Sequence, residues 1–384
     1  MTPFGLYCHV PFCVDTCDFC AFYQQKPRRG DIARFLAGVG RELELAPPDR
    51  PAQTFFWGGG TPSALTSDAL SRLGEVFLRA NAAAPAEWTV EMAPATVSRE
   101  RLAALRSLGV TRISLGAQSF DTATLAALGR RHLPTQIFRA WEMISAADFR
   151  DTSLDLIFAV PGQDEARWEA DLATAVRLAP CHISTYCLTL EEDTVLYARL
   201  AQANVAAGGA PAPPDPVREA ALYRATWAFL ENAGYAQYEI SNFARAGHAC
   251  VHNLNTWRMG EWLGYGPAAA SQHASRRFQN PADLERWLRG VESGELVREQ
   301  TVALTSQLLL QDALIFGLRM NEGVHLAKTE RRFGANFPPI VRVLGQRLVA
   351  EGFLETQNSG DLWRLTVEGR LRADAIAGAI LEIE

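Results

Sequence analysis

Short β-rich runs alternate with helical patterns as far as residue 233, and this alternation limits the folds open to the chain. The expected strands span residues 4–10, 54–57, 88–92, 111–116, 152–158 and 182–188. The helices expected after them lie near residues 30–46, 67–80, 98–107, in stretches up to 147, near 165–178 and near 217–233. Six β–α units in a row predict an α/β fold built on a parallel sheet, either open or closed.

The rhythm changes in the second half of the chain. The Pro/Gly/Ala-rich stretch 206–216 predicts a surface loop. From about residue 280 helical patterns dominate, and a β-like piece follows at 362–369. A chain of 384 residues also exceeds the usual size of one domain. We therefore predict a large domain over residues 1–284 and a small α-rich domain over residues 285–384.

Composition narrows the class of protein. Apolar residues make up 48% of the chain and charged residues 21%, with a net charge of −6, which fits a globular protein and argues against nucleic-acid binding. The N-terminus lacks the pattern of a signal peptide, and no apolar run approaches the roughly 18 residues of a membrane span. Three of the seven cysteines crowd together. This spacing favours metal ligation over disulfides and predicts a reducing cytoplasm.

The crowded cysteines are Cys13, Cys17 and Cys20, on one short loop directly after the first expected strand. Three thiolates on one loop can bind three irons of a [4Fe–4S] cubane and leave the fourth iron open. The amino and carboxylate groups of a substrate can then chelate that iron. The alternative is a zinc site in which His9 supplies a fourth ligand.

Polar groups and glycines follow several of the expected strands. The turn Gly58–Gly59–Gly60 after the second strand lets the backbone approach a ligand closely. Four polar residues stand at strand ends or in the segments that follow them: Glu91, Gln118, Arg130 and Asp155. A parallel barrel places its chemistry there. A carboxylate can bind an ammonium or ribose hydroxyls, and an arginine can bind a carboxylate through two hydrogen bonds. Alternatively, each of these residues is solvated or pairs with another group of the protein, without a role in ligand binding.

These motifs together resemble the radical S-adenosylmethionine (SAM) superfamily, and in particular its oxygen-independent coproporphyrinogen oxidase-like branch. The resemblance includes residues 6–13, 238–243, 263–266, 317–319 and 365–369. It implies a partial (β/α)6 TIM-type barrel followed by a small winged-helix-like domain. It also implies a [4Fe–4S] cluster on Cys13, Cys17 and Cys20. The SAM contacts that it implies are Tyr7, Gly59, Gly60, Thr61, Glu91, Gln118, Arg130 and Asp155.

Two features distinguish subfamilies within this branch. Coproporphyrinogen dehydrogenases carry an additional cysteine two positions after the third ligand, where this chain has Phe22. They also carry a long N-terminal segment, whereas here the first strand begins close to Met1. Both features favour the haem chaperone subfamily.

That subfamily assignment implies haem transfer to acceptor proteins, peripheral membrane contact during delivery, and no residue with a catalytic role. Two alternatives stay open, and both are radical SAM enzymes. One is the oxygen-independent coproporphyrinogen III dehydrogenase itself. The other is a related methyltransferase or cyclopropanase that uses two SAM molecules.

The haem-associated motif of the subfamily matches His252, Asn253 and Trp257, while its tyrosine position holds Thr256. The resemblance implies His252 as the haem ligand. His248 and Cys250 are the alternatives, because an extended backbone would place all three side chains on one face. The remaining cysteines, Cys8, Cys181 and Cys187, are expected to be buried core thiols, and Cys187 alternatively lines the SAM pocket because it stands near a strand end.

Overall fold

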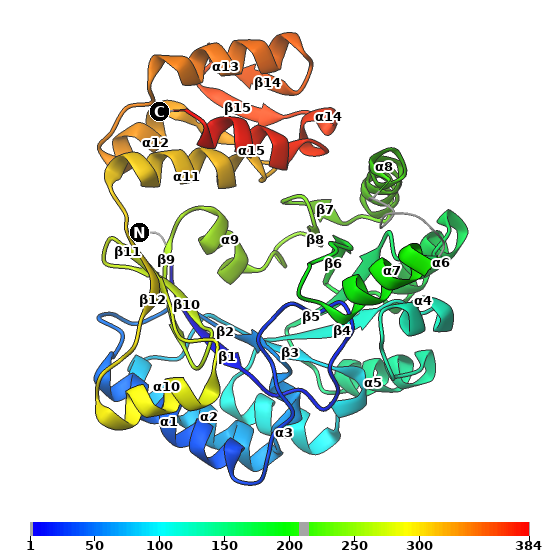
Figure 1. The fold of residues 1–384 in the computed structure, drawn as a ribbon, viewed down its shortest axis with the longest axis vertical. Helices are drawn as coiled ribbons and strands as arrows, with labels where there is room; N and C mark the ends of the chain where they lie inside the picture. Colours follow the sequence, from blue (N-terminus) through cyan, green and yellow to red (C-terminus); the bar gives the residue numbers. More distant parts are fainter. Residues whose placement is uncertain (1–2, 207–214, 384) are drawn as a thin grey trace.

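The computed structural model describes residues 3–206 and 215–383 and contains a twisted, 12-stranded sheet (Figure 1). Six of its parallel strands neighbour one another in chain order. They are β1 (Phe4–Val10), β2 (Thr54–Gly59), β3 (Glu87–Met92), β4 (Arg112–Gln118), β5 (Asp151–Phe158) and β6 (His182–Cys187). Within the described residues β1 and β6 do not pair with each other, so the predicted partial barrel is confirmed.

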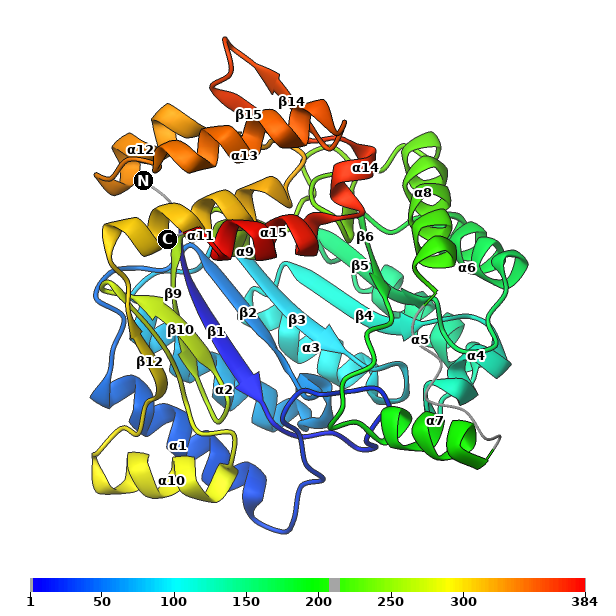
Figure 2. The same cartoon turned by 45° about the horizontal axis from the view of Figure 1, so that its top comes forward.

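The parallel strands are buried on both faces, as a strand covered by helices must be. Along β1, Phe4, Leu6, Cys8 and Val10 are fully buried. The helices between the strands cover the outer face (Figures 1 and 2). They are α1 (Asp31–Leu45), α2 (Ser67–Asn81), α3 (Arg99–Leu108), α4 (Thr122–Ala127), α5 (Pro134–Ala146), α6 (Glu165–Leu178), α7 (Val195–Ala206) and α8 (Pro216–Asn232). Two short 3-10 turns follow β2 and β3, at Pro62–Ala64 and Pro94–Thr96.

Local sequence sets where several helices begin. The side chains of Thr66, Ser98, Asp121 and Asp164 each accept a hydrogen bond from a backbone N–H in the first turn of the helix that follows.

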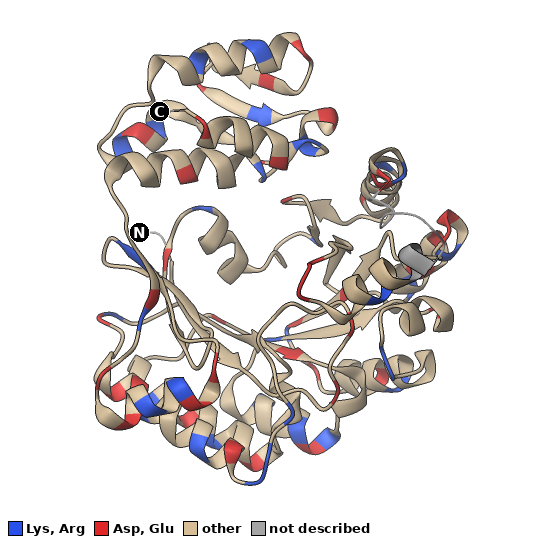
Figure 3. Cartoon of the chain, in the orientation of Figure 1, with Lys and Arg blue, Asp and Glu red and all other residues tan. Residues whose placement is uncertain are grey.

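Charged residues lie mainly over the outer helices, as Figure 3 shows. Within the described residues, no helix combines the length and apolar character needed to cross a membrane. Residues 207–214 of the predicted loop lie outside the described residues.

Further strands extend the sheet past both ends of the barrel. Next to β6 lie β8 (Asn242–Ala244) and β7 (Ala236–Gln237), and next to β1 lies β9 (Glu261–Tyr265). Beyond β9 follow β10 (Ala270–His273), β11 (Arg276–Gln279) and β12 (Glu299–Ala303). Helix α9 (Val251–Trp257) connects the two groups.

The domain boundary at residue 285 stays a prediction, but two elements near or beyond it pack with the barrel. Strand β12 pairs with β11 in the large sheet. Helix α10 (Leu284–Ser293) lies against α1, where the rings of Phe35 and Trp287 are 5.9 Å apart.

The C-terminal part has a sheet of its own with strand order β13-β15-β14. Its elements are α11 (Ser306–Leu318), β13 (Val324–His325), α12 (Leu326–Phe333), α13 (Pro339–Ala350), β14 (Leu354–Gln357), β15 (Leu362–Leu365), α14 (Val367–Arg370) and α15 (Ala373–Leu381). The β-like piece expected at 362–369 was half wrong. It turns helical after Leu365, because the Thr366 side chain caps α14 by accepting from Gly369 N–H.

Candidate functional site

The loop that carries the three clustered cysteines runs from the end of β1 to α1 and is held at both sides. Cys13 N–H donates to the carbonyl of Gln25 at 3.0 Å. Farther along, Asp18 N–H donates to the carbonyl of Leu128 at 3.2 Å, and the Asp18 carboxylate pairs with Arg199 at 2.7 Å. The loop is therefore fixed against the segment after β4 and against α7.

The three thiols influence one another's ionisation. The pKa of Cys13 is raised to about 11, mainly by burial and also by the nearby Cys17 and Cys20, while the Thr61 hydrogen bond and Arg130 oppose the rise. The Cys13 Sγ also lies 3.3 Å from the Thr61 hydroxyl. Three thiols that share one space and resist ionisation suit a bound cationic cluster, which would stabilise their thiolate forms.

The glycine turn after β2 lies directly beside this loop. Gly60 N–H donates to the Val10 carbonyl at 2.9 Å, and Thr61 N–H donates to the Phe12 carbonyl at 2.8 Å. Gly59 has φ +95°, and a Cβ there would lie 2.5 Å from His9. A side chain at Gly60 would collide with the Val10 carbonyl at 2.7 Å. Glycine is therefore required at both positions.

Two carboxylates, Glu91 on β3 and Asp155 on β5, lie near the cysteine loop. Burial raises the pKa of Glu91 to about 8, and the charge of Asp155 adds to the shift. Burial also raises the pKa of Asp155, although hydroxyls from Ser184, Ser114 and Ser153 bind its carboxylate. A cationic ligand between the two carboxylates would relieve their repulsion.

Arg130 carries the positive charge on the same side of the barrel. Its guanidinium lies 5.6 Å from the ring centre of Phe19 and lowers the pKa of both Cys17 and Asp155. Its Nε is buried and has no hydrogen-bond partner among the described residues. An unpaired guanidinium near buried thiols is ready to bind an anion such as a carboxylate.

Gln118 and Tyr7 complete the expected group. Gln118 has φ +66° and marks a register shift in the pairing of β4 with β5. Burial raises the pKa of Tyr7, and Glu91 raises it further, so the phenol and that carboxylate are close. The structure thus brings the expected residues of the cluster loop, glycine turn and strand ends to one mouth of the barrel.

Sequence reasoning missed most of the polar residues that support this group and considered His9 only as a possible zinc ligand. His9 lies 3.1 Å from the Tyr7 hydroxyl through Nδ1 and 2.8 Å from the Tyr23 carbonyl through Nε2. The serines Ser114, Ser153 and Ser184 lie inside otherwise apolar strands. Polar residues at interior strand positions were the signal that could have identified them.

The segment around His252 is not extended, so the expectation that His248, Cys250 and His252 share one face was wrong. Cys250 is the N-cap of α9, and His252 lies in its first turn. The cause is Glu87, whose carboxylate accepts from the backbone N–H groups of Val251 at 3.0 Å and His252 at 2.9 Å. These bonds satisfy the free donors that begin a helix.

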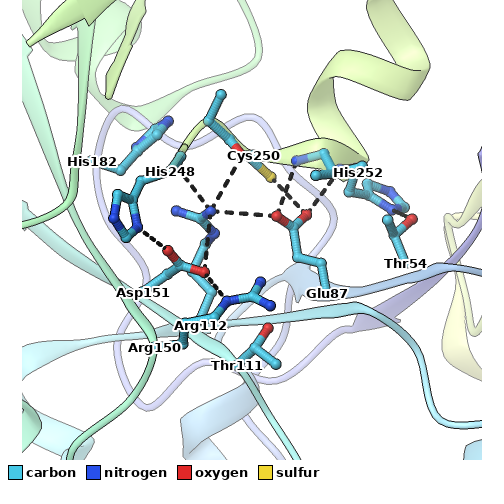
Figure 4. A network of polar contacts seen from close by, with 12 residues as sticks. Thr54, Glu87, Thr111, Arg112, Arg150, Asp151, His182, His248, Cys250 and His252 are labelled. Atoms are coloured by element: carbon cyan, nitrogen blue, oxygen red, sulfur yellow. Dashed lines mark hydrogen bonds and ion pairs between the residues drawn. The ribbon is translucent and has the colours of Figure 1, made fainter. Parts of the chain in front are cut away.

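The three side chains accordingly have different partners (Figure 4). His248 Nδ1 lies 2.5 Å from Asp151, and the Cys250 thiol lies 3.5 Å from Glu87. His252 Nδ1 lies 2.9 Å from the hydroxyl of Thr54. Burial lowers the pKa of His252 to about 4, so its imidazole is neutral at pH 7.

A buried arginine connects these partners. Arg112 is 2% exposed, and its guanidinium lies 3.3 Å from Glu87 and 3.6 Å from Asp151. The same group donates to the His248 carbonyl at 3.0 Å. The network in Figure 4 therefore joins the beginnings of β3, β4 and β5 to the start of α9.

A cavity of about 610 Å³ lies between α9, the neighbouring sheet and α11. Its lining comprises Tyr186, Glu239, Ser241, Asn242, Asn253, Thr256, Trp257, Met259, Trp262, Gln272, Arg277, Phe316 and Arg319. Three of the α9 motif positions line it, but His252 does not, nor do His248 and Cys250.

The remaining cysteines divide into two kinds. Cys8 is fully buried, as expected. Cys181 and Cys187 are only partly buried, so the expectation of fully buried thiols was wrong for both, although Cys187 packs against the hydrophobic core. Cys181 directly precedes β6, and Cys187 is its last residue.

Comparison with known proteins places these features in a family. The model of the Radical SAM superfamily matches residues 7–175, and that of the HemN C-terminal domain matches residues 304–372. The heme chaperone HemW of Mycobacterium tuberculosis is 34% identical over 99% of this chain and 95% of its own length. HemW of Escherichia coli is 32% identical over 97% of this chain and 96% of its own.

A solved structure shares the fold. It is that of the coproporphyrinogen III oxidase HemN of E. coli, described as a radical SAM enzyme, which superposes with a TM-score of 0.83 at 23% identity. The match covers 99% of this chain and 90% of that one.

Proposed function

Because the chain belongs to the family of the heme chaperone HemW, we propose that it binds haem and passes it to acceptor proteins. The observation that carries the proposal is the cavity of about 610 Å³ against α9. Asn253, Trp257 and Thr256, which stands at the tyrosine position of the motif, all line it. An apolar cavity with a few polar groups is the usual form of a cofactor site.

Two arginines, Arg277 and Arg319, line the cavity together with the carboxylate of Glu239. Arg277 is paired with Asp312, and Arg319 is paired with Asp374. The Nε of Arg319 is buried and lacks a hydrogen-bond partner among the described residues, and its guanidinium lies 5.6 Å from the ring centre of Trp257. A propionate can occupy that free donor. Trp257 and Phe316, with ring centres 5.8 Å apart, offer aromatic surface to the porphyrin.

His252 is our proposed iron ligand, with His248 and Cys250 as the alternatives. A neutral imidazole is the form that binds iron, and His252 is neutral at pH 7 because its pKa is about 4. Its Nδ1 contacts Thr54, so the ring must turn toward the cavity, or α9 must shift, before it can reach an iron there.

We also propose a [4Fe–4S] cluster on Cys13, Cys17 and Cys20, with SAM beside it. Two observations support this fit. A Cβ added at Gly59 or Gly60 would collide with neighbouring atoms, and the Nε of Arg130 has no hydrogen-bond partner among the described residues. Arg130 would bind the SAM carboxylate, and Glu91 and Asp155 would bind its ammonium and ribose hydroxyls. The proposed contacts are Tyr7, Gly59, Gly60, Thr61, Glu91, Gln118, Arg130 and Asp155. When bound, a reduced cluster of this kind supplies an electron to SAM.

Tyr186 lies between the two proposed sites. It lines the cavity and is 42% exposed, and desolvation and the charges of Asp155 and Glu91 raise its pKa. A ligand in the cavity would therefore lie near Asp155 and Glu91, two of the proposed SAM contacts. This closeness also favours a second candidate, a radical SAM enzyme acting on a porphyrin: the coproporphyrinogen III dehydrogenase, or a methyltransferase or cyclopropanase.

The proposed working environment is the cytoplasm, with peripheral membrane contact during haem delivery. All seven cysteines are free, and reduced thiols are what cluster assembly requires.

A transfer assay tests the proposed haem chaperone function. Cluster-loaded protein carrying haem is mixed anaerobically with an apo-haemoprotein, and the absorbance of the acceptor is followed.

Haem appearing in the acceptor faster than free haem enters it supports the chaperone function. A parallel arm supplies SAM, dithionite and coproporphyrinogen. Decarboxylated product in that arm, without haem transfer in the first, would favour the dehydrogenase.

A further inference from the structure

We propose that Asp151, Cys181 and His248 form a binding site for one divalent transition-metal ion of the zinc class. One oxygen, sulfur and nitrogen atom from these side chains all lie within 4.8 Å of one another. Asp151 begins β5, Cys181 directly precedes β6, and His248 lies in the loop before α9. The site is thus at the amino ends of the strands, whereas the cluster loop follows the carboxyl end of β1.

The carboxylate of Asp151 is oriented for a ligand role. It is 3% exposed, and its Oδ2 faces Arg150 Nε at 2.9 Å and Arg112 Nη2 at 3.6 Å. Its Oδ1 faces His248 Nδ1 at 2.5 Å. The arginines therefore fix one oxygen and leave the other directed at the imidazole, in the way that outer partners orient metal ligands.

The backbones of the other two residues are also fixed. Cys181 N–H donates to the Thr152 carbonyl at 3.0 Å, and the Cys181 carbonyl accepts from Arg245 N–H at 2.9 Å. His248 N–H donates to the Arg245 carbonyl at 3.0 Å. Arg245 thereby links the cysteine to the histidine, so the two backbones are fixed. A metal ion would have to replace the hydrogen bond between Asp151 Oδ1 and His248 Nδ1.

The donor set determines the metal. A thiolate and an imidazole favour zinc or cobalt(II), whereas magnesium and calcium prefer oxygen ligands. Three protein ligands leave a fourth tetrahedral position for water. The side chain of His248 is 33% exposed and Cys181 is partly exposed, so an ion can enter from solvent.

The charges around the site cancel before a metal binds. Glu87, Asp151 and a Cys181 thiolate are negative, while Arg112, Arg150 and Arg245, whose Nε faces the Pro180 carbonyl at 3.4 Å, are positive. Arg150 is also 55% exposed and can turn away into water. The competing interpretation is a plain His–Asp ion pair beside a free thiol, which would bind no metal specifically.

The experiment uses protein with its iron–sulfur cluster assembled, so that the cluster cysteines are occupied. Zinc is added anaerobically, excess is removed by dialysis, and zinc and iron are counted by elemental analysis. X-ray absorption at the zinc edge then reports the zinc neighbours without interference from iron. Wild type should bind one zinc with a single sulfur at about 2.3 Å.

Cys181→Ser and His248→Asn should each weaken zinc binding by about tenfold or more, at unchanged iron content. Cys187→Ser, which removes the other partly buried β6 thiol, is the matched control and should bind zinc like wild type. Unchanged iron content also shows that a variant has folded. The proposal fails if wild type retains no zinc, if Cys181→Ser binds it equally well, or if zinc has two or more sulfur neighbours. Haem binding does not enter these readouts, so they are independent of the proposed function.

Discussion

The backbone N–H of His252 donates a 2.9 Å hydrogen bond to the carboxylate of Glu87, which is itself ion-paired with the buried Arg112. A charged pair at the beginning of the barrel strands therefore fixes the first turn of the helix that carries the proposed haem motif. The orientation of α9 relative to the cavity depends on this pair.

Replacing Glu87 by glutamine should destabilise the protein. The change removes one of the two carboxylates that balance Arg112 and weakens the bonds that begin α9. We expect the free energy of unfolding to fall by about 2–4 kcal/mol, somewhat below the full cost of breaking a buried ion pair because Asp151 remains. Urea denaturation measures it. Glu44→Gln, on the exposed face of α1, is the control and should cost less than about 1 kcal/mol.

Glu91 should make stability fall as the pH rises. Its pKa is about 8 in the folded protein, above the ordinary value of 4.5, so unfolding releases a proton between these two pH values. In that window the unfolded state binds fewer protons than the folded state, and stability therefore declines with pH. Glu91→Gln should remove this part of the decline. In cluster-free protein, the free energy of unfolding of the variant should rise relative to that of wild type between pH 5 and 8. If the two free energies change in parallel with pH, the pKa assigned to Glu91 is wrong.

Arg130 is a proposed SAM contact, and its neighbour Arg131 provides a matched control. Arg130 has a buried, unpaired Nε near the cysteine loop, whereas the side chain of Arg131 is 73% exposed and pairs with Asp15. Arg130→Ala should weaken SAM binding by about 1–3 kcal/mol, the usual loss for a hydrogen bond to a charged group. Arg131→Ala should leave it unchanged. Calorimetric titration of cluster-loaded protein with SAM measures both affinities. Equal affinities in the two variants would rule out the assigned contact.

The cysteine loop should be indispensable for the cluster. Alanine at Cys13, Cys17 or Cys20 should abolish stable cluster binding, because three iron sites each need one thiolate. Anaerobic reconstitution followed by iron and sulfide analysis should give about four of each in wild type. Alanine at Cys250 should leave that count unchanged. A reconstituted wild type that retains zinc in place of iron would overturn the cluster assignment.

Much of the barrel could be predicted because its signals are local. The run Phe4–Val10 is apolar except for His9 and the phenol of Tyr7, and its predicted bounds coincide with β1. The helix expected at 165–178 likewise coincides with α6, which begins at the Asp164 cap. The residues at one mouth could be placed together because parallel strands end on the same side.

The α9 region could not be predicted in this way. Its conformation depends on Glu87, which is distant in the sequence and itself sits at the start of a strand. Strands β7 to β12 are only two to five residues long, and β8 and β9 join the sheet by pairing with the distant strands β6 and β1, so no strong local pattern identified them. The side-chain partners of His248 and Cys181 likewise depend on contacts between separate loops.

A haem titration followed by absorbance tests the central claim most directly. It compares wild type with His252→Ala, Trp257→Ala and the control His325→Ala, which removes a partly exposed histidine from the C-terminal part. The account predicts one haem per chain in wild type and His325→Ala. It predicts at least about tenfold weaker binding in Trp257→Ala and an altered Soret band with weaker binding in His252→Ala. Wild type that binds no haem, or binding that is unchanged in both α9 variants, would contradict it.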